Sequence, residues 1–143
     1  MKNILHHDGE LYILSAAFAT HLEGWGSTPP NLYVGIDNRE IINANDTLAI
    51  AVSREPKAST YKRISLSTSG GFVVVPRERK LRAEASFEAE YDYGIISKYF
   101  LTTARSGNSG KLIVSVAMKH ERAIFASDIL KLEITLGLKD DKF

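Results

Sequence analysis

The sequence contains no cysteine, and this absence removes several chemistries at once. Without a thiol, the chain has no disulfide framework and no thiolate that could act as a nucleophile or a zinc ligand. Its stability must therefore come from a hydrophobic core and from any partner subunits. A chain of 143 residues has about the length of one domain and can bury such a core. We expect a single domain over residues 1–143.

The chain also lacks an excess of charge and a long apolar run. Its Lys and Arg number 18 against 17 Asp and Glu, so a net charge of +1 gives no overall field that would attract nucleic acid or an anionic membrane. The longest apolar-rich window, Leu11 to Phe18, is far shorter than the roughly 20 residues of a membrane-spanning helix. We expect no nucleic-acid partner and no membrane partner, and synthesis in the cytosol of the producing cell.

Motifs that carry catalysis in other proteins are absent or incomplete. The loop that ends in Gly110-Lys111 resembles a phosphate-binding loop, but Arg105 and Leu112 stand where that motif needs a glycine and a Ser or Thr. No zinc-binding His-Glu pattern, nucleophile elbow or calcium loop occurs. The adjacent His6 and His7 cannot face one metal together, and we expect both to be exposed. The sequence predicts no catalytic residue, no metal and no cofactor.

The strongest pattern that is present is the alternation of the last strand. Leucine or isoleucine occupies every second position from Leu130 to Leu138, with polar or small residues between them, which is the period of a strand with one buried face. Further strands are predicted at 31–36, 61–67, 72–75, 83–93, 99–103 and 112–118. A Gly70-Gly71 turn is expected to join the second and third of these as a hairpin. The fold class is mainly β, an antiparallel β-sandwich of jelly-roll type.

One helix is expected near the N-terminus. Apolar residues recur at helical spacing from Leu11 to Leu22, so residues 1–24 are predicted to form an N-terminal arm and an amphipathic helix. The segment 48–52 is too short for periodicity to choose between helix and strand.

Two charged segments have a functional and a structural interpretation each. Four carboxylates follow the outer face of the strand 83–93, where they could bind a hard cation or act as general acid and base. Their surroundings are alike, whereas catalytic carboxylates need unlike ones, so a solvated face is favoured. The basic run from Pro76 to Arg82 could bind phosphate, but it lacks interleaved aromatic residues, and a solvated loop or strand edge is favoured.

The order of several short motifs resembles a family of short virion structural proteins of tailed bacteriophages. The motifs are Tyr33-Val34-Gly35-Ile36, Asp46-Thr47-Leu48, Tyr61-Lys62-Arg63, Tyr99-Phe100-Leu101-Thr102-Thr103, Gly110-Lys111-Leu112 and Ser127-Asp128-Ile129-Leu130. The resemblance extends from about Leu11 to Leu138. It implies a β-sandwich virion component that decorates the capsid or belongs to the neck or tail, and that is not an enzyme. The implied partners are the major capsid protein or neck and tail proteins.

The expected function is therefore that of a capsid-decorating or head-tail accessory subunit. Strands 72–75 and 130–138 carry few charges that would protect a sheet edge, so we expect a homo-oligomer, with a trimer as the first expectation. The candidate interface residues are Leu11, Leu14, Phe18, Leu132, Ile134 and Leu136. The alternative is a tail-fibre or baseplate domain that binds a host carbohydrate through Trp25, Tyr33 or Tyr91.

Overall fold

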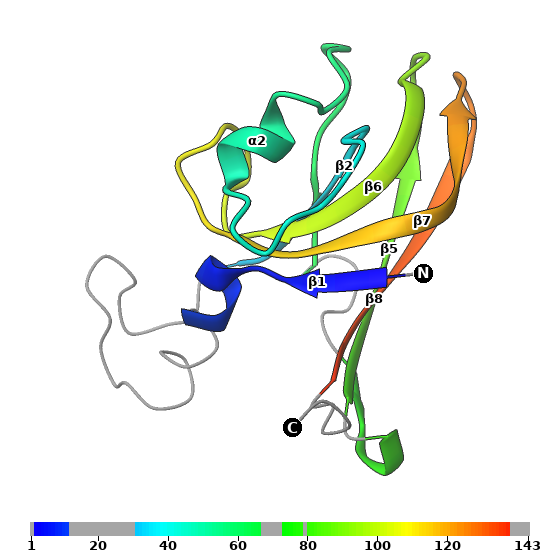
Figure 1. Cartoon of the computed structure of the whole chain (residues 1–143). Helices are drawn as coiled ribbons and strands as arrows, with labels where there is room; N and C mark the ends of the chain where they lie inside the picture. Colours follow the sequence, from blue (N-terminus) through cyan, green and yellow to red (C-terminus); the bar gives the residue numbers. More distant parts are fainter. Residues whose placement is uncertain (1, 12–30, 67–72, 79, 138–143) are drawn as a thin grey trace.

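The computed structural model describes residues 2–11, 31–66, 73–78 and 80–137, which form two antiparallel sheets (Figure 1). The larger sheet has the strand order β1-β7-β6-β2-β3 and the smaller sheet the order β4-β5-β8. The predicted fold class is confirmed, because the chain is mainly β with a sandwich-like arrangement of its sheets. The elements are β1 (Lys2–Leu5), β2 (Tyr33–Asp37), α2 (Leu48–Val52), β3 (Ile64–Ser65), β4 (Val73–Val75), the 3-10 turn η1 (Pro76–Glu78), β5 (Lys80–Glu88), β6 (Gly94–Thr102), β7 (Leu112–Ile124) and β8 (Ile129–Gly137).

The smaller sheet follows the predicted alternation. Ala83 lies opposite Ile134, and Ala85 lies opposite Leu132, and all four side chains are buried. The small residues on β5 leave room for the large residues on β8, whereas Glu84 faces solvent between them. Because the side-chain period of a strand is two, a slip of one residue would bury the carboxylates and expose the leucines. The predicted inward face of β8 is confirmed, because Leu132 and Ile134 are buried.

The larger sheet is covered on both faces in its central part. Tyr99 and Leu101 belong to the core between the two sheets. Phe100, which points the other way on β6, packs in a second cluster that includes Leu48 of α2. Its ring lies directly on Gly35, where an added Cβ would be 2.3 Å from the nearest ring carbon. Glycine at position 35 is therefore required for α2 to lie over β2 and β6 (Figure 1).

The predicted hairpin around Gly70-Gly71 is wrong. The strand before it, β3, pairs with β2, whereas the strand after it, β4, pairs with β5, so the two strands belong to different sheets. The turn η1 reverses the chain directly after Val75 and gives β4 a neighbouring partner in β5. Of the basic run, Pro76–Glu78 form this turn, as the predicted solvated loop would. Residues 80–82 begin β5 and pair with both β4 and β8, so the alternative prediction of a strand edge is wrong for this part.

The predicted strand 83–93 ends earlier than its alternation indicates. β5 stops at Glu88, since the chain then turns and bonds to the connection between β7 and β8. Beyond the turn, Tyr93 is buried, whereas Tyr91 is 64% exposed. Periodicity in the sequence does not register this change, because the turn residues continue the same alternation.

The N-terminal residues form part of the larger sheet. β1 pairs with the first half of β7, and the amide of Asn3 donates to the carbonyl of Thr135 on β8 at 2.9 Å. A helical turn follows at residues 7–11, and the rest of the predicted amphipathic helix lies outside the described residues. The prediction that His6 is exposed is wrong, since this side chain is fully buried. Among the helices that are described, none is long and apolar enough to cross a membrane.

Candidate functional site

The structure distributes the predicted site residues over very different environments. Leu132 and Ile134 lie in the core of the single chain, and Leu136 packs against it. Leu11 and Tyr91 are more than half exposed, while Tyr33 is partly buried at the start of β2. Leu14, Phe18 and Trp25 lie outside the described residues. The described candidates therefore do not gather into one site, and other features of the molecule have to be considered.

A buried serine and histidine lie in the geometry of a nucleophile and its base. Ser115 Oγ is 2.6 Å from His6 Nε2, and His6 Nδ1 is 3.4 Å from the carbonyl oxygen of Ala44. A carbonyl can only accept, so a neutral His6 carries its proton on Nδ1 and accepts the hydroxyl proton of Ser115 at Nε2. A hydroxyl bonded in this way to histidine is how hydrolases activate serine. In this protein both side chains are fully buried, so no substrate reaches them.

The same serine belongs to a buried ionic network. Arg39 Nη2 donates to Ser115 Oγ at 2.9 Å, and the Arg39 guanidinium binds both carboxylate oxygens of Asp37 at 2.7 and 3.0 Å. A second ion pair joins Arg39 Nη1 to Asp46 at 3.3 Å. Because each polar group has a partner, the network connects β2, β7 and the residue that follows β1 without an unsatisfied buried charge. We interpret it as a structural clamp, which we call the Arg39 clamp (His6, Asp37, Arg39, Asp46 and Ser115).

The Arg39 clamp makes stability depend on pH. Burial lowers the pKa of His6, with Arg39 acting in the same direction against the carbonyl of Ala44 and the carboxylate of Asp46. A folded His6 thus binds a proton less readily than an unfolded one, so its contribution to stability is complete above the ordinary value of 6.5 and is lost as the pH falls below it. Urea midpoints measured between about pH 7.5 and pH 5 should fall more for the wild type than for His6→Gln. Equal slopes for the two proteins would contradict this role, and the exposed His120→Gln variant is the control.

A second ionic cluster holds the loop after α2 against the connection between β6 and β7. Arg63 binds Glu55 with two hydrogen bonds of 2.7 and 3.0 Å, and donates to the carbonyls of Ala104 and Gly107 at 2.7 and 2.8 Å. Tyr61 donates to the same carboxylate at 2.5 Å. Burial, and then the neighbouring Glu55, raises the pKa of Tyr61 well above its ordinary value, so its hydroxyl remains a donor. This cluster is also structural.

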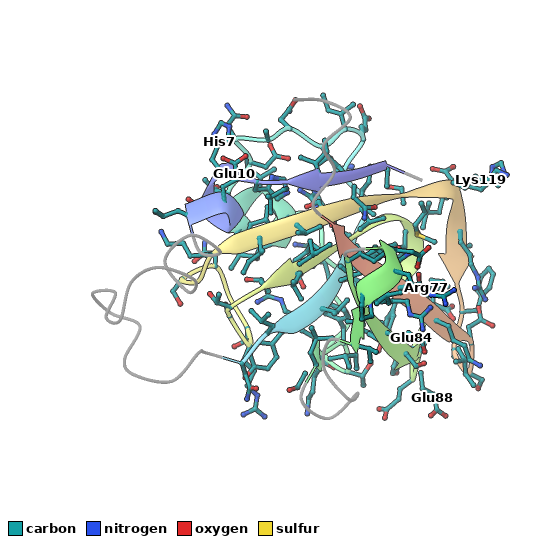
Figure 2. All side chains as sticks on the ribbon, turned by 90° about the horizontal axis from the view of Figure 1, so that it is seen from below. His7, Glu10, Arg77, Glu84, Glu88 and Lys119 are labelled. Carbon is teal, nitrogen blue, oxygen red and sulfur yellow. The ribbon has the colours of Figure 1, made fainter. Side chains whose placement is uncertain are left out.

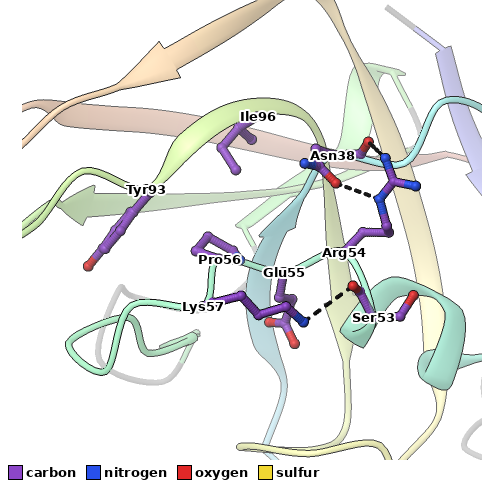
Figure 3. Close-up of a pocket in the computed structure, with 8 residues that line it drawn as sticks. All are labelled: Asn38, Ser53, Arg54, Glu55, Pro56, Lys57, Tyr93 and Ile96. Carbon is purple, nitrogen blue, oxygen red and sulfur yellow. Dashed lines mark hydrogen bonds between the residues drawn. The ribbon is translucent and has the colours of Figure 1, made fainter.

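A shallow pocket of about 220 Å³ lies beside these residues (Figure 3). It is lined by Asn38, Ser53, Arg54, Glu55, Pro56, Lys57, Tyr93 and Ile96. Arg54 donates to the side chain and the carbonyl of Asn38 at 2.7 and 3.1 Å, and Lys57 donates to the carbonyl of Ser53 at 3.3 Å. The Glu55 carboxylate is bound by Arg63. The lining thus contains polar groups that bind one another rather than a nucleophile beside a base.

The acidic stripe faces solvent, as predicted for its structural interpretation. Glu84, Glu88 and Glu90 are exposed on and after β5, and Asp92 accepts a hydrogen bond of 2.9 Å from the backbone of Ala126. Within the described part of the chain, no three carboxylate or imidazole groups lie together as metal ligands would. The stripe is a charged surface.

Of the nine large apolar side chains that are exposed in the described part of the chain, four lie on neighbouring segments at one end of the molecule. Tyr91, Ile95, Phe125 and Ile129 are 64, 51, 59 and 55% exposed, and we call them the end patch. They lie on the β5–β6 and β7–β8 connections and the strand ends beside them, in the upper right of Figure 1. Large apolar side chains that are exposed together are typical of a surface that binds a partner.

The backbone under the end patch is held by hydrogen bonds between the two connections. Tyr93 N donates to the carbonyl of Ile124 at 2.9 Å, and Ala89 exchanges bonds of 2.9 and 2.7 Å with Asp128 and Ser127. Ser127 has a φ of 76°, and the Asp128 carboxylate beside it accepts from the Phe125 amide at 2.8 Å. A surface fixed in this way loses little conformational entropy when it binds.

Of the end patch, the sequence analysis named only Tyr91, and it named no residue of the Arg39 clamp as a candidate site. A signal for the patch was available, since Ile95 precedes the buried Ile96 and Phe125 follows the buried Ile124. Strand periodicity then points both residues outward. The sequence contained no signal for the clamp, because its five residues are separated by up to 109 positions and meet only in the folded sheet.

Similarity to known proteins adds nothing to this geometry. A scan against protein-family models finds none that matches the chain, and a search of curated proteins finds no match either. The fold and the described surface define a β-sandwich-like protein in which four exposed apolar side chains lie at one end.

Proposed function

We propose that the chain is a structural subunit of a tailed-bacteriophage virion, acting as a capsid-decorating protein or as an accessory of the neck or tail. The observation that carries the proposal is the end patch, four apolar side chains on a rigid corner of the sandwich. Such a surface favours assembly with protein partners. The ordered motifs that resemble virion proteins favour the phage particle as the place of that assembly, after synthesis in the host cytoplasm.

Quantitative mass spectrometry of purified particles tests this proposal. A structural subunit is present in a fixed copy number relative to the major capsid protein, and it remains with the particle through density-gradient purification. A cytoplasmic protein of the infected cell is lost during purification. Absence of the chain from intact particles would contradict the proposal.

The proposed subunit is a homo-oligomer, with a trimer as the first expectation. Virion positions offer symmetry axes around which identical surfaces meet, and closed rings hide exposed apolar side chains. Light scattering at micromolar concentration should therefore give three times the chain mass of 15.8 kDa. A mass equal to a single chain at all concentrations would contradict self-assembly.

A second candidate function is binding of a host carbohydrate by a tail-fibre or baseplate domain. The observation that favours it is Tyr91, an aromatic ring that is 64% exposed at the tip of the molecule. Sugar rings stack on such side chains, which present an apolar body with a polar end. A glycan array with the wild type and Tyr91→Ala would test it: hits that Tyr91→Ala loses favour carbohydrate binding, and an empty array favours the structural role.

A further inference from the structure

Charged side chains of opposite sign lie on the two strands that lead into the end patch. Glu88 and Glu90, which are exposed, form an acidic flank at the end of β5. Lys119 and Arg122, also exposed, form a basic flank on β7, with Glu121 between them. Figure 2 shows Glu88 and Lys119 at opposite ends of one side of the molecule, with the second half of β7 between them. This end of the molecule thus carries exposed apolar side chains together with an acidic group at the end of β5 and a basic group on β7.

An irregularity in β7 creates the basic flank. Ile96 on β6 pairs with Arg122, and Lys98 pairs with Ala117, so one residue of β6 lies opposite the four residues 118–121 of β7. The extra residues bend β7 toward the smaller sheet, as Figure 1 shows. Bulges of this kind redirect side chains at the ends of sheets. Here Lys119 is one of the unpaired residues of the bulge, and its side chain is exposed.

We infer that the end patch binds a second copy of this chain, with the acidic flank of one copy facing the basic flank of the next. The inference rests on the proposed function, because it names the contact surface of the proposed homo-oligomer. A surface that carries both signs of charge on either side of an apolar centre is complementary to itself under rotation. A different protein would have to carry its own apolar surface with a basic group facing the acidic flank and an acidic group facing the basic flank. A second copy of this chain already carries both groups.

The apolar centre is tested with Phe125→Ser, compared with Val73→Ser as the matched control. Phe125 and Val73 are 59 and 55% exposed, but Val73 lies on β4, which pairs with the start of β5 at the far end of the smaller sheet. Sedimentation equilibrium of the full chain should show association weakened by at least about tenfold for Phe125→Ser and unchanged for Val73→Ser. Circular dichroism melting of each variant verifies the fold.

The flanks are tested by reversing their charges. Lys119→Glu with Arg122→Glu makes both flanks acidic, and Glu88→Lys with Glu90→Lys makes both flanks basic, so each double variant should associate at least about tenfold more weakly at low salt. The combined variant with all four changes exchanges the two flanks and should regain association. An equal mixture of the two double variants should also associate. In a ring with an odd number of copies, the mixture recovers less than the combined variant, because one contact always joins like charges.

The outcomes separate this inference from the proposed function. Loss of association by Phe125→Ser, with recovery in the combined charge variant, supports the end-patch contact. If the wild type associates and Phe125→Ser and the double variants associate equally well, the end-patch contact is wrong. The proposed structural role is then unaffected. A wild type that stays monomeric overturns the contact as well. If Phe125→Ser does not fold, the charge variants decide, since all four of their positions are exposed.

Discussion

Replacing Arg39 by methionine should cost about 3–5 kcal/mol of unfolding free energy, because it leaves two buried carboxylates without their cation. Asp37 is fully buried and Asp46 is 7% exposed, so water cannot replace the lost ion pairs. The Ser115 hydroxyl also loses a donor at 2.9 Å. Urea denaturation of the variant and the wild type at neutral pH measures the difference.

The matched control is Arg105→Met, which removes an arginine of the same size from an exposed position. Its effect should stay within about 0.5 kcal/mol, as for ordinary surface changes. Adding Asp37→Asn and Asp46→Asn to Arg39→Met removes the uncompensated charges and should recover a large part of the stability, because removing a whole buried ion-pair network costs less than breaking it. An Arg39→Met protein within about 1 kcal/mol of the wild type would show that the clamp does not hold the strands together.

Replacing Ile134 by aspartate should abolish the folded state. Ile134 is 2% exposed and faces Ala83 in the core between the sheets. The change removes an apolar side chain worth about 2–5 kcal/mol and places a carboxyl where it has no partner, at a further cost of several kcal/mol. This sum is comparable to the whole stability of a domain, about 5–15 kcal/mol. The variant should give no soluble protein with a cooperative melting transition.

The control for Ile134→Asp is Lys131→Asp, which introduces the same residue on the exposed face of the same strand. It should fold, and its free energy of unfolding from urea denaturation should lie within about 0.5 kcal/mol of the wild-type value. Normal yield and cooperative melting of Ile134→Asp would mean that the inward face of β8 is assigned to the wrong set of residues.

Alternation in the sequence was sufficient to predict which side chains of β5 and β8 point into the core, although it did not predict that these strands pair. Leu130, Leu132 and Ile134 point inward because a strand of period two that is half buried leaves no other face for them. The same argument named strands 72–75 and 130–138 as those with weakly protected edges, and they are the two outer strands of the smaller sheet. Local patterns of this kind depend only on residues close in sequence, so they can be read without the fold.

Pairing between distant segments could not be predicted in the same way. The Gly70-Gly71 pair indicated a hairpin, but whether a strand pairs with its predecessor or with its successor depends on long-range packing. β3 pairs with β2, thirty residues earlier along the chain, rather than with β4. His6 was expected to be exposed because a polar residue near a chain end usually is, and only the pairing of β1 with β7 brings it to Ser115.

The side chains of the larger sheet also protect the exposed edge of β8. Tyr99 on β6 donates to the carbonyl of Glu133 at 2.6 Å, and Asn3 donates to the carbonyl of Thr135 at 2.9 Å. Burial, followed by the nearby Glu133, raises the pKa of Tyr99 to about 12, so the hydroxyl stays protonated and remains a donor. Because these two carbonyls are engaged, the edge of β8 is a weaker site for addition of a foreign strand than its apolar sequence suggests. This leaves the end patch as the surface we favour for assembly.

Cryo-electron microscopy of the intact virion tests assembly of this subunit most directly. We expect symmetric density into which several copies of the sandwich fit, with Phe125 of one copy at the contact with the next and Glu88 of one copy near Lys119 of its neighbour. Particles without density for the chain, or copies that do not touch each other through this end, would contradict the account.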